Sequence, residues 1–488
     1  MADYEIVIGL EVHVQLLTRS KMFCSCSAAY QDAEPNTEVC PVCLGLPGVL
    51  PVINRKAVEY VVRTGLALNC RIAEVTKFDR KNYPYPDLMK GYQISQYDLP
   101  VAEDGYLMVN VGEGQRRIGV TRVHLEEDVA KLLHRTEPHG EGYSLLDVNR
   151  AGVALMEIVS EPDMRSPEEA RNYLIQLRSI VQYIGVGTAN MEEGSFRCDA
   201  NISVRPFGAP EYGRKVEIKN MNSLRGVFRA LEYEAGRQQR AAAEGETIYQ
   251  ETRGWNDERG VTVPQRSKEY AHDYRYFPEP DLPPIALSRD MVAEVRAGLP
   301  ELPEARKTRF VSEFELSAYD ASQLTASRAM ADYFEAVVEG AAGDRTALAK
   351  STANWMLSEL QGHMNAAGVD IEAIKINPSQ IVELLALVDS GTLNSTMAKT
   401  VFDEMFETGG APKEIAEALG LVQISDADAI ASAVSEAIQN NPNPVKDYLG
   451  GKETALRFLV GQVMKLTRGK ANPQMASELL RERLEMMR

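Results

Sequence analysis

The chain has 488 residues, 44% of them hydrophobic, and carries a formal net charge of −17. Its length predicts about two to four domains, its composition excludes a disordered chain, and its acidic charge argues against indiscriminate nucleic-acid binding. No apolar run approaches the roughly 20 residues that a membrane helix needs, and the N-terminal residues do not resemble a signal peptide, so we expect a cytoplasmic protein with no membrane contact.

Short segments of the first 285 residues alternate between apolar and polar side chains. In the first predicted strand, Leu10, Val12 and Val14 share one face, whereas Glu11 and His13 share the other. The same alternation predicts strands over residues 122–126, 199–205 and 216–219. Because antiparallel strands commonly bury one face and leave the other in solvent, we expect an antiparallel sheet whose open face carries many ionisable residues.

Four of the six cysteines form two close pairs, Cys24 with Cys26 and Cys40 with Cys43. Two such pairs separated by a short loop are typical of a tetrahedral zinc site with four thiolate ligands. Four thiolates fill the coordination sphere, so this zinc would be structural, and a zinc hydrolase is disfavoured because it needs an open metal position. Free or redox-active thiols are the alternative.

Acidic residues and histidines gather on the polar faces of the predicted strands. Glu11 and His13 share a strand face, and His124 points to the same side of its strand as Glu126. Carboxylates gathered on a sheet face can bind Mg²⁺, which also holds phosphate oxygens. A polar face that only meets solvent is the alternative, but an acidic patch without cations repels itself, so several such faces together favour a cation site.

Three cationic residues could balance these acids. Lys81, Arg205 and Lys219 carry the charge that binds a phosphate or a carboxylate, although surface cations are commonly only solvated. Tyr83 and Tyr85 follow Lys81 closely, and aromatic rings between cations can stack on single-stranded RNA bases. The alternative for these tyrosines is a rigid, packed loop.

Two helices are indicated in this part of the chain. The segment Ser166-Pro167-Glu168-Glu169 predicts a capping box with proline at the first helical position, and Gly185 marks the end of that helix. The second predicted helix runs from about residue 223 to residue 243. Both carry an apolar stripe at helical spacing.

The proline-rich segment Phe277–Pro284 cannot continue a helix or a strand and marks a domain boundary. Beyond it, helix-forming residues with helical periodicity dominate, as in 327–341 and 352–364. The turn at Gly409–Pro412 indicates a second break, before a small helical tail.

The end of the chain differs in charge from the rest. Residues 445–488 hold nine Lys/Arg and five Asp/Glu, so this end carries +4 and the remainder −21. A basic end on an acidic body suits a protein that touches RNA at one place, and an ordinary solvated helical face is the alternative. Neither a G-x-x-x-x-G-K-[ST] phosphate loop nor a G-x-S-x-G nucleophile turn is present in the sequence.

A series of segments resembles the B subunits of glutamyl/aspartyl-tRNA amidotransferases. The resemblance covers essentially the whole chain and is strongest before residue 285, in the segments Val7–Leu16, Phe78–Tyr85, Gly91–Gln96, His124–Asp128, Asp147–Arg150, Glu157–Asp163, Met191–Ser195, Arg197–Asn201 and Asp273–Asp281. The resemblance implies an α+β fold with three domains. These are a mixed α/β cradle over residues 1–287 with an antiparallel sheet and the zinc motif, an all-α domain over 288–407, and a small helical tRNA-binding tail over 408–488.

The resemblance also implies an activity, that of an ATP-dependent carbon–nitrogen ligase with glutamine as nitrogen donor. The family converts Glu-tRNA(Gln) to Gln-tRNA(Gln), Asp-tRNA(Asn) to Asn-tRNA(Asn), or both. Its cradle binds ATP and Mg²⁺ and phosphorylates the side-chain carboxylate, and ammonia released from glutamine by the amidase (glutaminase) partner, known as the A subunit, then displaces the phosphate. A small C subunit tethers the two. A non-catalytic tRNA-binding adaptor of the same complex is the alternative, and the sequence leaves the choice between tRNA(Asn) and tRNA(Gln) open.

The family's site can be carried onto this sequence residue by residue. The implied ligands of Mg²⁺ and ATP are Glu11, His13, Glu126 and Glu127. The implied catalytic residues, which neutralise phosphate or substrate charge or complete the pocket, are Lys81, Arg205, Lys219, Glu157 and Asp199.

Overall fold

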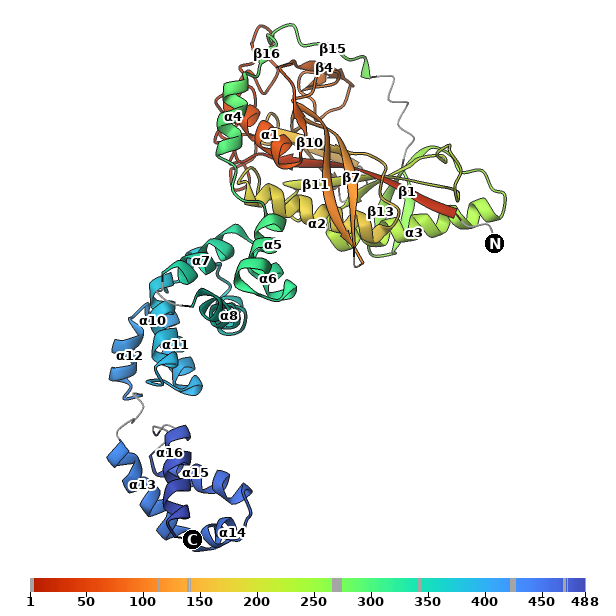
Figure 1. Cartoon of the computed structure of the whole chain (residues 1–488). Coiled ribbons are helices and arrows are strands. Elements are labelled where there is room, and N and C mark those ends of the chain that lie inside the picture. The colour runs from red at the N-terminus through yellow and green to blue at the C-terminus, as the bar shows by residue number, and fades with distance from the viewer. Residues whose placement is uncertain are drawn as a thin grey trace. The chain divides into compact units, whose positions relative to one another are not determined.

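The computed structural model describes residues 4–112, 114–137, 140, 142–265, 274–340, 344–421, 427–467, 471 and 473–487. The chain divides into two compact units, Met1–Leu302 and Pro303–Arg488 (Figure 1). Asp273 of the last signature segment and Arg468, Lys470 and Arg488 of the basic end lie outside the described residues.

One large sheet forms the framework of the first unit. Its nine described strands follow the order β14-β13-β12-β11-β1-β10-β7-β6-β2. Neighbouring strands are antiparallel except β12 and β13, which are parallel. These strands are β1 Tyr4–Gln15, β2 Arg71–Ile72, β6 Ala102–Val111, β7 Gly114–Glu127, β10 Ala154–Ser160, β11 Phe196–Pro206, β12 Val216–Met221, β13 Glu251–Asn256 and β14 Val261–Pro264.

The described part of the first unit has three smaller sheets: the three-stranded β15-β4-β5 and the two-stranded β16-β3 and β8-β9. Their strands are β3 Val75–Thr76, β4 Asp79–Asn82, β5 Tyr92–Ser95, β8 Lys131–Thr136, β9 Gly142–Asp147, β15 Phe277–Pro278 and β16 Ile285–Ala286. The β4-β5 hairpin lies beside the polar end of β7, because β5 residues bond to the carboxylates there.

Helices cover one face of the large sheet and leave the other open. Leu10, Val12 and Val14 of β1 are at most 1% exposed and belong to the main core, so alternation directs Glu11 and His13 to the open face, as predicted. The helices of this unit are α1 Arg55–Ala67, α2 Pro167–Tyr183, α3 Leu224–Ala243 and α4 Arg289–Ala297 (Figure 1).

The starts of α2 and α3 follow their capping residues. Ser166 accepts a hydrogen bond from the Glu169 N–H, and Ser223 accepts one from the Gly226 N–H. The capping box predicted for α2 forms only in part. The Glu169 carboxylate accepts its 2.8 Å bond from the N–H of Arg165, not from that of Ser166, because it is also drawn to the Arg116 guanidinium 3.0 Å away.

The regular elements of the second unit are helices in the residues that the structure describes, and they form two hydrophobic cores. Helices α5 to α12 surround one, and α13 to α16 surround the other. The helices are α5 Pro303–Phe314, α6 Ala318–Leu324, α7 Arg328–Glu339, α8 Arg345–Trp355, α9 Gln361–Ala367, α10 Pro378–Asp389, α11 Ser395–Thr408, α12 Pro412–Ala418, α13 Ala427–Asn440, α14 Pro442–Leu449, α15 Thr454–Leu466 and α16 Pro473–Glu485. A π-helical segment, Met356–Leu360, joins α8 to α9.

The prediction of a mixed α/β N-terminal part followed by a helical part is confirmed. The first unit continues past residue 287 because α4 packs Val295 into the main core. Likewise, α12 places Ile415 and Ala416 in the core of α5 to α12. The three domains with boundaries at 287/288 and 407/408 stay a prediction. Among the described residues, no helix has both the length and the apolar composition needed to cross a membrane.

Candidate active site

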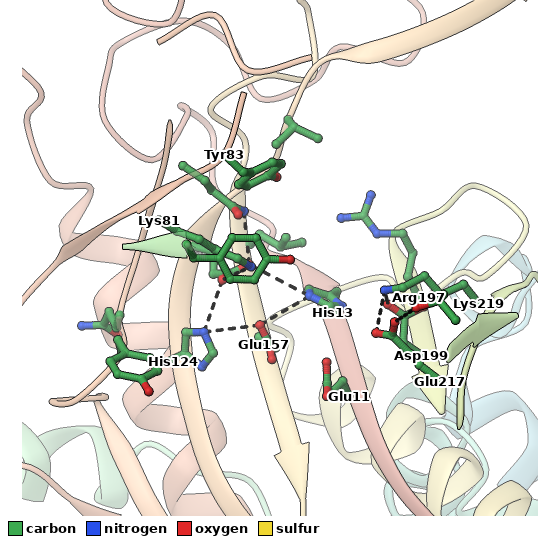
Figure 2. A pocket seen from close by; sticks show the side chains of 18 of the residues that line it. Glu11, His13, Lys81, Tyr83, His124, Glu157, Arg197, Asp199, Glu217 and Lys219 are labelled. Atoms are coloured by element: carbon green, nitrogen blue, oxygen red, sulfur yellow. Dashed lines mark hydrogen bonds and ion pairs between the residues drawn. The ribbon is translucent and has the colours of Figure 1, made fainter. Parts of the chain in front are cut away.

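The open face of the sheet carries a row of ionisable residues across four adjacent strands. His124 of β7 pairs with Glu157 of β10, Glu157 pairs with His13 of β1, and His13 pairs with Arg197 of β11. Directly opposed residues of antiparallel strands have Cβ atoms about 5 Å apart. The register therefore brings together side chains that are far apart in the sequence (Figure 2).

The two imidazoles of this row contact two buried carboxylates. His13 Nε2 lies 3.5 Å from Glu157 Oε2 and 4.0 Å from Glu126 Oε2. His124 Nε2 lies 3.4 Å from both Glu126 Oε1 and Glu157 Oε2. Lys81 Nζ, from β4, lies 4.0 Å from Glu126 Oε1. The set combines two carboxylates, two imidazoles and one ammonium within a few ångströms.

Neighbouring side chains fix the orientation of the Glu126 carboxylate. Ser95 Oγ donates a 2.7 Å hydrogen bond to Oε1, and Gln93 Nε2 donates one of 3.2 Å to Oε2. Both donors belong to β5 and are buried. A carboxylate held in this way loses little rotamer freedom when it binds a cation.

The charges of the cluster are mutually dependent. Burial opposes ionisation of Glu126, but the Lys81 ammonium and His124 lower its pKa. Burial likewise opposes ionisation of Glu157, yet His124, His13 and Lys81 bring its pKa well below the ordinary value. Burial favours neutral His13, whereas the Glu157 and Glu126 carboxylates raise its pKa overall. Both carboxylates are therefore anionic at neutral pH.

A second polar cluster lies on β11 and β12, next to the first. Lys219 Nζ lies 2.7 Å from Asp199 Oδ2 and 2.9 Å from Glu217 Oε1. Asn201 Nδ2 donates a 2.9 Å hydrogen bond to Glu11 Oε1. Burial, together with repulsion from Glu157 and Glu217, raises the pKa of Glu11. An extra cation here would relieve that repulsion.

Both clusters line one cavity of about 910 Å³. This volume is within the range of small-molecule and cofactor sites, about 300–1,000 Å³. The predicted site residues that line it are Glu11, His13, Lys81, Glu126, Glu157, Asp199 and Lys219. The structure thus brings seven of the nine predicted sheet residues to one place.

The structure does not bring the other two, Arg205 and Glu127, to this cavity. Arg205 lies toward the far end of β11, where its Nε donates a 2.6 Å bond to Glu5. Glu127 points to the opposite side from Glu126, where it pairs with Lys90 at 2.5 Å and accepts a 2.9 Å bond from the Ile94 N–H.

Several lining residues were not among the predicted site residues: His124, Arg197, Glu217, Tyr274 and Tyr276. Alternation alone would have found Arg197 and Glu217, since they lie two residues from Asp199 and Lys219 on the same strand faces. The tyrosines give no such signal, because they follow the main sheet strands in sequence and reach the cavity through the β15-β4 pairing.

The geometry of the first cluster fits a divalent cation. One ligand atom each of His13, Glu126 and Glu157 lies within 4.8 Å of the others. Two carboxylate oxygens suit Mg²⁺, which fills its remaining positions with water or phosphate oxygens. The adjacent Lys81 ammonium could contact the same oxygens.

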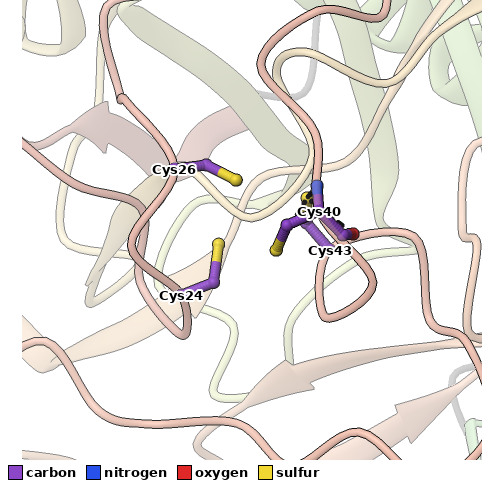
Figure 3. Close-up of side chains that lie close together, drawn as sticks. All are labelled: Cys24, Cys26, Cys40 and Cys43. Atoms are coloured by element: carbon purple, nitrogen blue, oxygen red, sulfur yellow. Dashed lines mark hydrogen bonds between the residues drawn. The ribbon is translucent and has the colours of Figure 1, made fainter.

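The four paired cysteines form a separate cluster, in which their sulfur atoms converge within 4.8 Å of one another (Figure 3). All four are free of disulfide bonds. Hydrogen bonding by Cys24, aided by the Lys21 ammonium, lowers the pKa of the Cys43 thiol to about 4 against the effect of burial. The cluster is compatible with the four-thiolate zinc site predicted from its spacing.

Comparison with known proteins gives matches along nearly the whole chain. A family model described as the GatB/GatE catalytic domain matches residues 6–293, and one described as the GatB domain matches residues 332–484. The chain is 58% identical over 490 residues to the aspartyl/glutamyl-tRNA(Asn/Gln) amidotransferase B subunit of Dehalococcoides mccartyi strain ATCC BAA-2266, covering 99% of this chain and 100% of the relative. The proteins of the same name from Carboxydothermus hydrogenoformans and Moorella thermoacetica are each 55% identical to it, and each alignment covers 99% of this chain.

Proposed function

The chain belongs to the GatB/GatE family of tRNA-dependent amidotransferase B subunits, and on this premise we propose that it activates the side-chain carboxylate of a misacylated tRNA. Its substrates are Glu-tRNA(Gln), Asp-tRNA(Asn) or both. ATP phosphorylates the carboxylate and ammonia then replaces the phosphate, giving the amide. The observation that carries this chemistry is the acid-rich cavity that holds both Lys81 and the His13–Glu126–Glu157 cluster.

The two steps follow from the poor reactivity of a carboxylate, whose leaving group would be oxide. In the first step a carboxylate oxygen attacks the γ-phosphorus of ATP and ADP leaves, which produces an acyl phosphate. In the second step ammonia attacks the acyl carbon, inorganic phosphate leaves, and the nitrogen loses a proton. Phosphoryl transfer of this kind depends on positioning and on cations near the phosphoryl oxygens more than on covalent help from the protein.

The residues of the first cluster suit this requirement. Glu126 and Glu157 would hold Mg²⁺, with His13 as a third ligand or as a partner of its water. Bound Mg²⁺ supplies positive charge to the phosphoryl oxygens. Lys81 would donate to the same oxygens, and its ammonium stays charged because Glu126 raises its pKa against the effect of burial.

The second cluster completes the site. Lys219 is the proposed contact for a substrate carboxylate or phosphate, and Asp199 and Glu217 hold its ammonium in place. Glu11 interacts with Glu157 of the first cluster and with Glu217 of the second. It is therefore placed to share a cation with either cluster.

The remaining parts of the complex follow from the same premise. We propose an amidase partner, the A subunit, as the source of ammonia, together with a small C subunit and contact between the helical tail and the tRNA. The four cysteines would hold one structural zinc, since four thiolates leave no position open for substrate. A non-catalytic tRNA-binding adaptor is the alternative function, and it predicts that the chain itself neither binds ATP nor affects the chemical step.

Substituting Glu126 by Gln tests the proposed function. The change keeps the shape of the side chain but removes one negative charge from the cation site. We expect amidation of misacylated tRNA to fall by about 10²–10³ in rate, as for loss of one well-placed electrostatic group. The assay uses the complete complex, each of the two misacylated tRNAs, and either glutamine or free ammonia as nitrogen donor.

The matched control is Glu103→Gln, which neutralises an acid paired with Arg71 outside the cavity and should leave amidation unchanged. Glutamine hydrolysis by the assembled complex should survive in part in Glu126→Gln and be unchanged in Glu103→Gln, because that reaction belongs to the amidase partner. Amidation by Glu126→Gln at a near wild-type rate with both nitrogen donors would require the cation site to be placed elsewhere. It would also favour the adaptor if ATP binding were absent.

A further inference from the structure

Residues 274–281, called the strap below, include β15 (Figure 1) and contribute Tyr274 and Tyr276 to the lining of the cavity. Within the strap, β15 pairs with β4 only through Phe277 opposite Arg80 and Pro278 opposite Asp79. Two more bonds hold it: the Glu279 N–H donates to the Phe78 carbonyl at 2.9 Å, and Asn82 Nδ2 donates to the Arg275 carbonyl at 2.9 Å. So short a ladder gives the strap few backbone bonds of its own.

An ion pair also attaches the strap to β4. Arg80 Nε donates to Glu279 Oε2 at 2.7 Å and Arg80 Nη2 donates to Glu279 Oε1 at 2.8 Å, while Asp281 Oδ2 lies 3.2 Å from the same Nη2. The Glu279 side chain is fully buried, and the guanidinium lies 4.2 Å from the Tyr92 ring centre. A planar two-point contact of this kind fixes direction as well as distance.

The strap also forms the aromatic wall around Lys81. Tyr276 stacks on Tyr97 with ring centres 4.4 Å apart, and Tyr274 packs edge-on against Tyr83 at 5.6 Å. Lys81 Nζ lies 5.2 Å from the centre of the Tyr274 ring and 4.0 Å from Glu126 Oε1. The ring and the carboxylate together limit the positions open to this ammonium.

Strand alternation links the Arg80–Glu279 ion pair to the contact between Lys81 and Tyr274. Arg80 and Lys81 are successive residues of β4, so their side chains leave the strand on opposite sides. Arg80 bonds to Glu279 of the strap, whereas Lys81 lines the cavity together with Tyr274 and Tyr276 of the strap. Loss of the Arg80–Glu279 ion pair would let Tyr274 and Tyr276 move away from Lys81 without removing any group from the cavity itself.

We propose that Arg80 is a positioning residue for the phosphoryl-transfer step, acting through Glu279 and the strap to hold Tyr274 and Tyr276 against Lys81. The inference rests on the proposed function for its kinetic consequence, but its structural part does not. Arg80 touches no reacting atom in this arrangement. It fixes the place of an ammonium that does, and a misplacement of about 1 Å can cost about 10²-fold in rate.

The test uses Arg80→Lys and Glu279→Gln in the full chain assembled with its partner subunits. Arg80→Lys keeps the charge but loses the two-point hydrogen bond of the guanidinium, and Glu279→Gln keeps the shape but loses the charge. The first readout is the rate at which an amine-acylating reagent modifies Lys81 without any ligand present, followed by mass spectrometry. The second is kcat and KM for ATP in amidation.

Both variants should be modified at Lys81 several times faster than the wild type, and kcat should fall by up to about 10²-fold with a smaller change in KM. Arg71→Lys is the matched control, because it makes the same substitution at an exposed ion pair of the same unit, and neither readout should change. If one variant fails to assemble, the other decides.

Unchanged Lys81 modification in Arg80→Lys and Glu279→Gln would overturn the proposal, whatever the reaction catalysed. Faster modification with wild-type kcat would overturn it too, provided that Glu126→Gln lowers amidation. Faster modification together with an active Glu126→Gln variant would leave the strap's grip on Lys81 supported and place the failure in the proposed function.

Discussion

Lys21 is a fully buried cation beside the cysteine cluster. Its Nζ donates to the Glu38 carbonyl at 2.7 Å and lies 3.8 Å from Cys43 Sγ. Among the residues that the structure describes, no carboxylate forms an ion pair with it. Burying an ammonium without a counter-charge is costly. Four thiolates around Zn²⁺ carry a net charge of −2, and Lys21 would balance part of it.

Zinc binding by the wild type and by Lys21→Met therefore tests both the zinc site and the proposal that the Lys21 ammonium balances part of its negative charge. We expect the wild type to hold about one zinc per chain, and Lys21→Met to bind zinc about 10–100-fold more weakly, as for loss of other groups that support metal ligands. Zinc content after dialysis against graded chelator measures both. Lys56→Met, on the exposed side of α1, is the control. Clearly less than one zinc in the wild type would contradict the site, and equal retention in Lys21→Met would contradict the role of the charge.

At the residue scale, the sequence predicts which face a side chain occupies better than where along the strand it acts. Glu11, His13 and Glu126 line the cavity because alternation directs them to the open face and their positions along β1 and β7 bring them close together. Arg205 shares the face of Asp199, but six residues of extended chain span about 20 Å, so it meets Glu5 instead. Glu127 follows Glu126 directly and must therefore point the other way.

At the scale of single elements, α2 shows how a local signal is used in a modified form. The Ser166 hydroxyl caps the helix as predicted, whereas the Glu169 carboxylate bonds to the N–H of the preceding Arg165 and to Arg116 of β7. The helix start is thus tied to the sheet as well as capped. Sequence spacing shows that these groups are present, but only the tertiary packing decides which N–H the carboxylate meets.

We expect Ser166→Ala to destabilise the start of α2 by about 1 kcal/mol, since the Glu169 N–H loses its hydroxyl acceptor. The measurement is hydrogen exchange of the backbone amides in Pro167–Tyr183 of the full chain, which should quicken about fivefold for that free-energy change. Ser312→Ala, in the exposed face of α5, should change its own region little. Unchanged exchange over α2 would show that the cap contributes nothing measurable.

Sequence reasoning located four of the nine described strands of the large sheet, but it could not give their order. Periodicity located parts of β1, β7, β11 and β12, but it contains no information on which strand pairs with which. The parallel pairing of β12 with β13 requires a crossover, and α3 provides it. Periodicity could not place the strap tyrosines in the cavity either. They reach it through a pairing between β15 and β4, which links segments about two hundred residues apart in the chain.

At the scale of the whole molecule, the chain has groups for one of the two reactions of the proposed complex but no sequence motif for the other. The first unit offers carboxylates, imidazoles and ammonium groups suited to phosphoryl transfer, but the sequence contains no nucleophile turn for amide hydrolysis. We expect the purified chain alone to release no ammonia from glutamine, and the complex with its amidase partner to do so. A coupled ammonia assay on contaminant-free chain measures this. Sustained release by the chain alone would show that a hydrolytic site had been missed.

The helical tail has a core of its own, which makes it separable from the rest of the chain. Helices α13 to α16 bury Ile430, Val434, Leu459 and Leu480 together, and Leu421 is the last described residue that packs on the core of α5 to α12. A chain ending at Leu421 therefore keeps both other cores. The sequence-based break near residue 410 would instead remove α12, which contributes to the core that remains.

We expect removal of the tail after Leu421 to weaken tRNA binding while the assembled complex still hydrolyses glutamine. The reason is electrostatic: Lys446, Lys452 and Arg457 are exposed on the tail, and binding of cations to phosphate releases counterions from RNA. Binding isotherms at several salt concentrations measure the effect.

Replacing these three cations by Gln keeps the fold and should flatten the dependence of log K on log salt by about 0.7–0.9 for each phosphate that is no longer neutralised. Lys413→Gln on α12 makes the same change outside the tail and should leave that slope unaltered. If both the truncated chain and the triple variant bound tRNA with wild-type affinity and salt dependence, the tail would have to serve another partner.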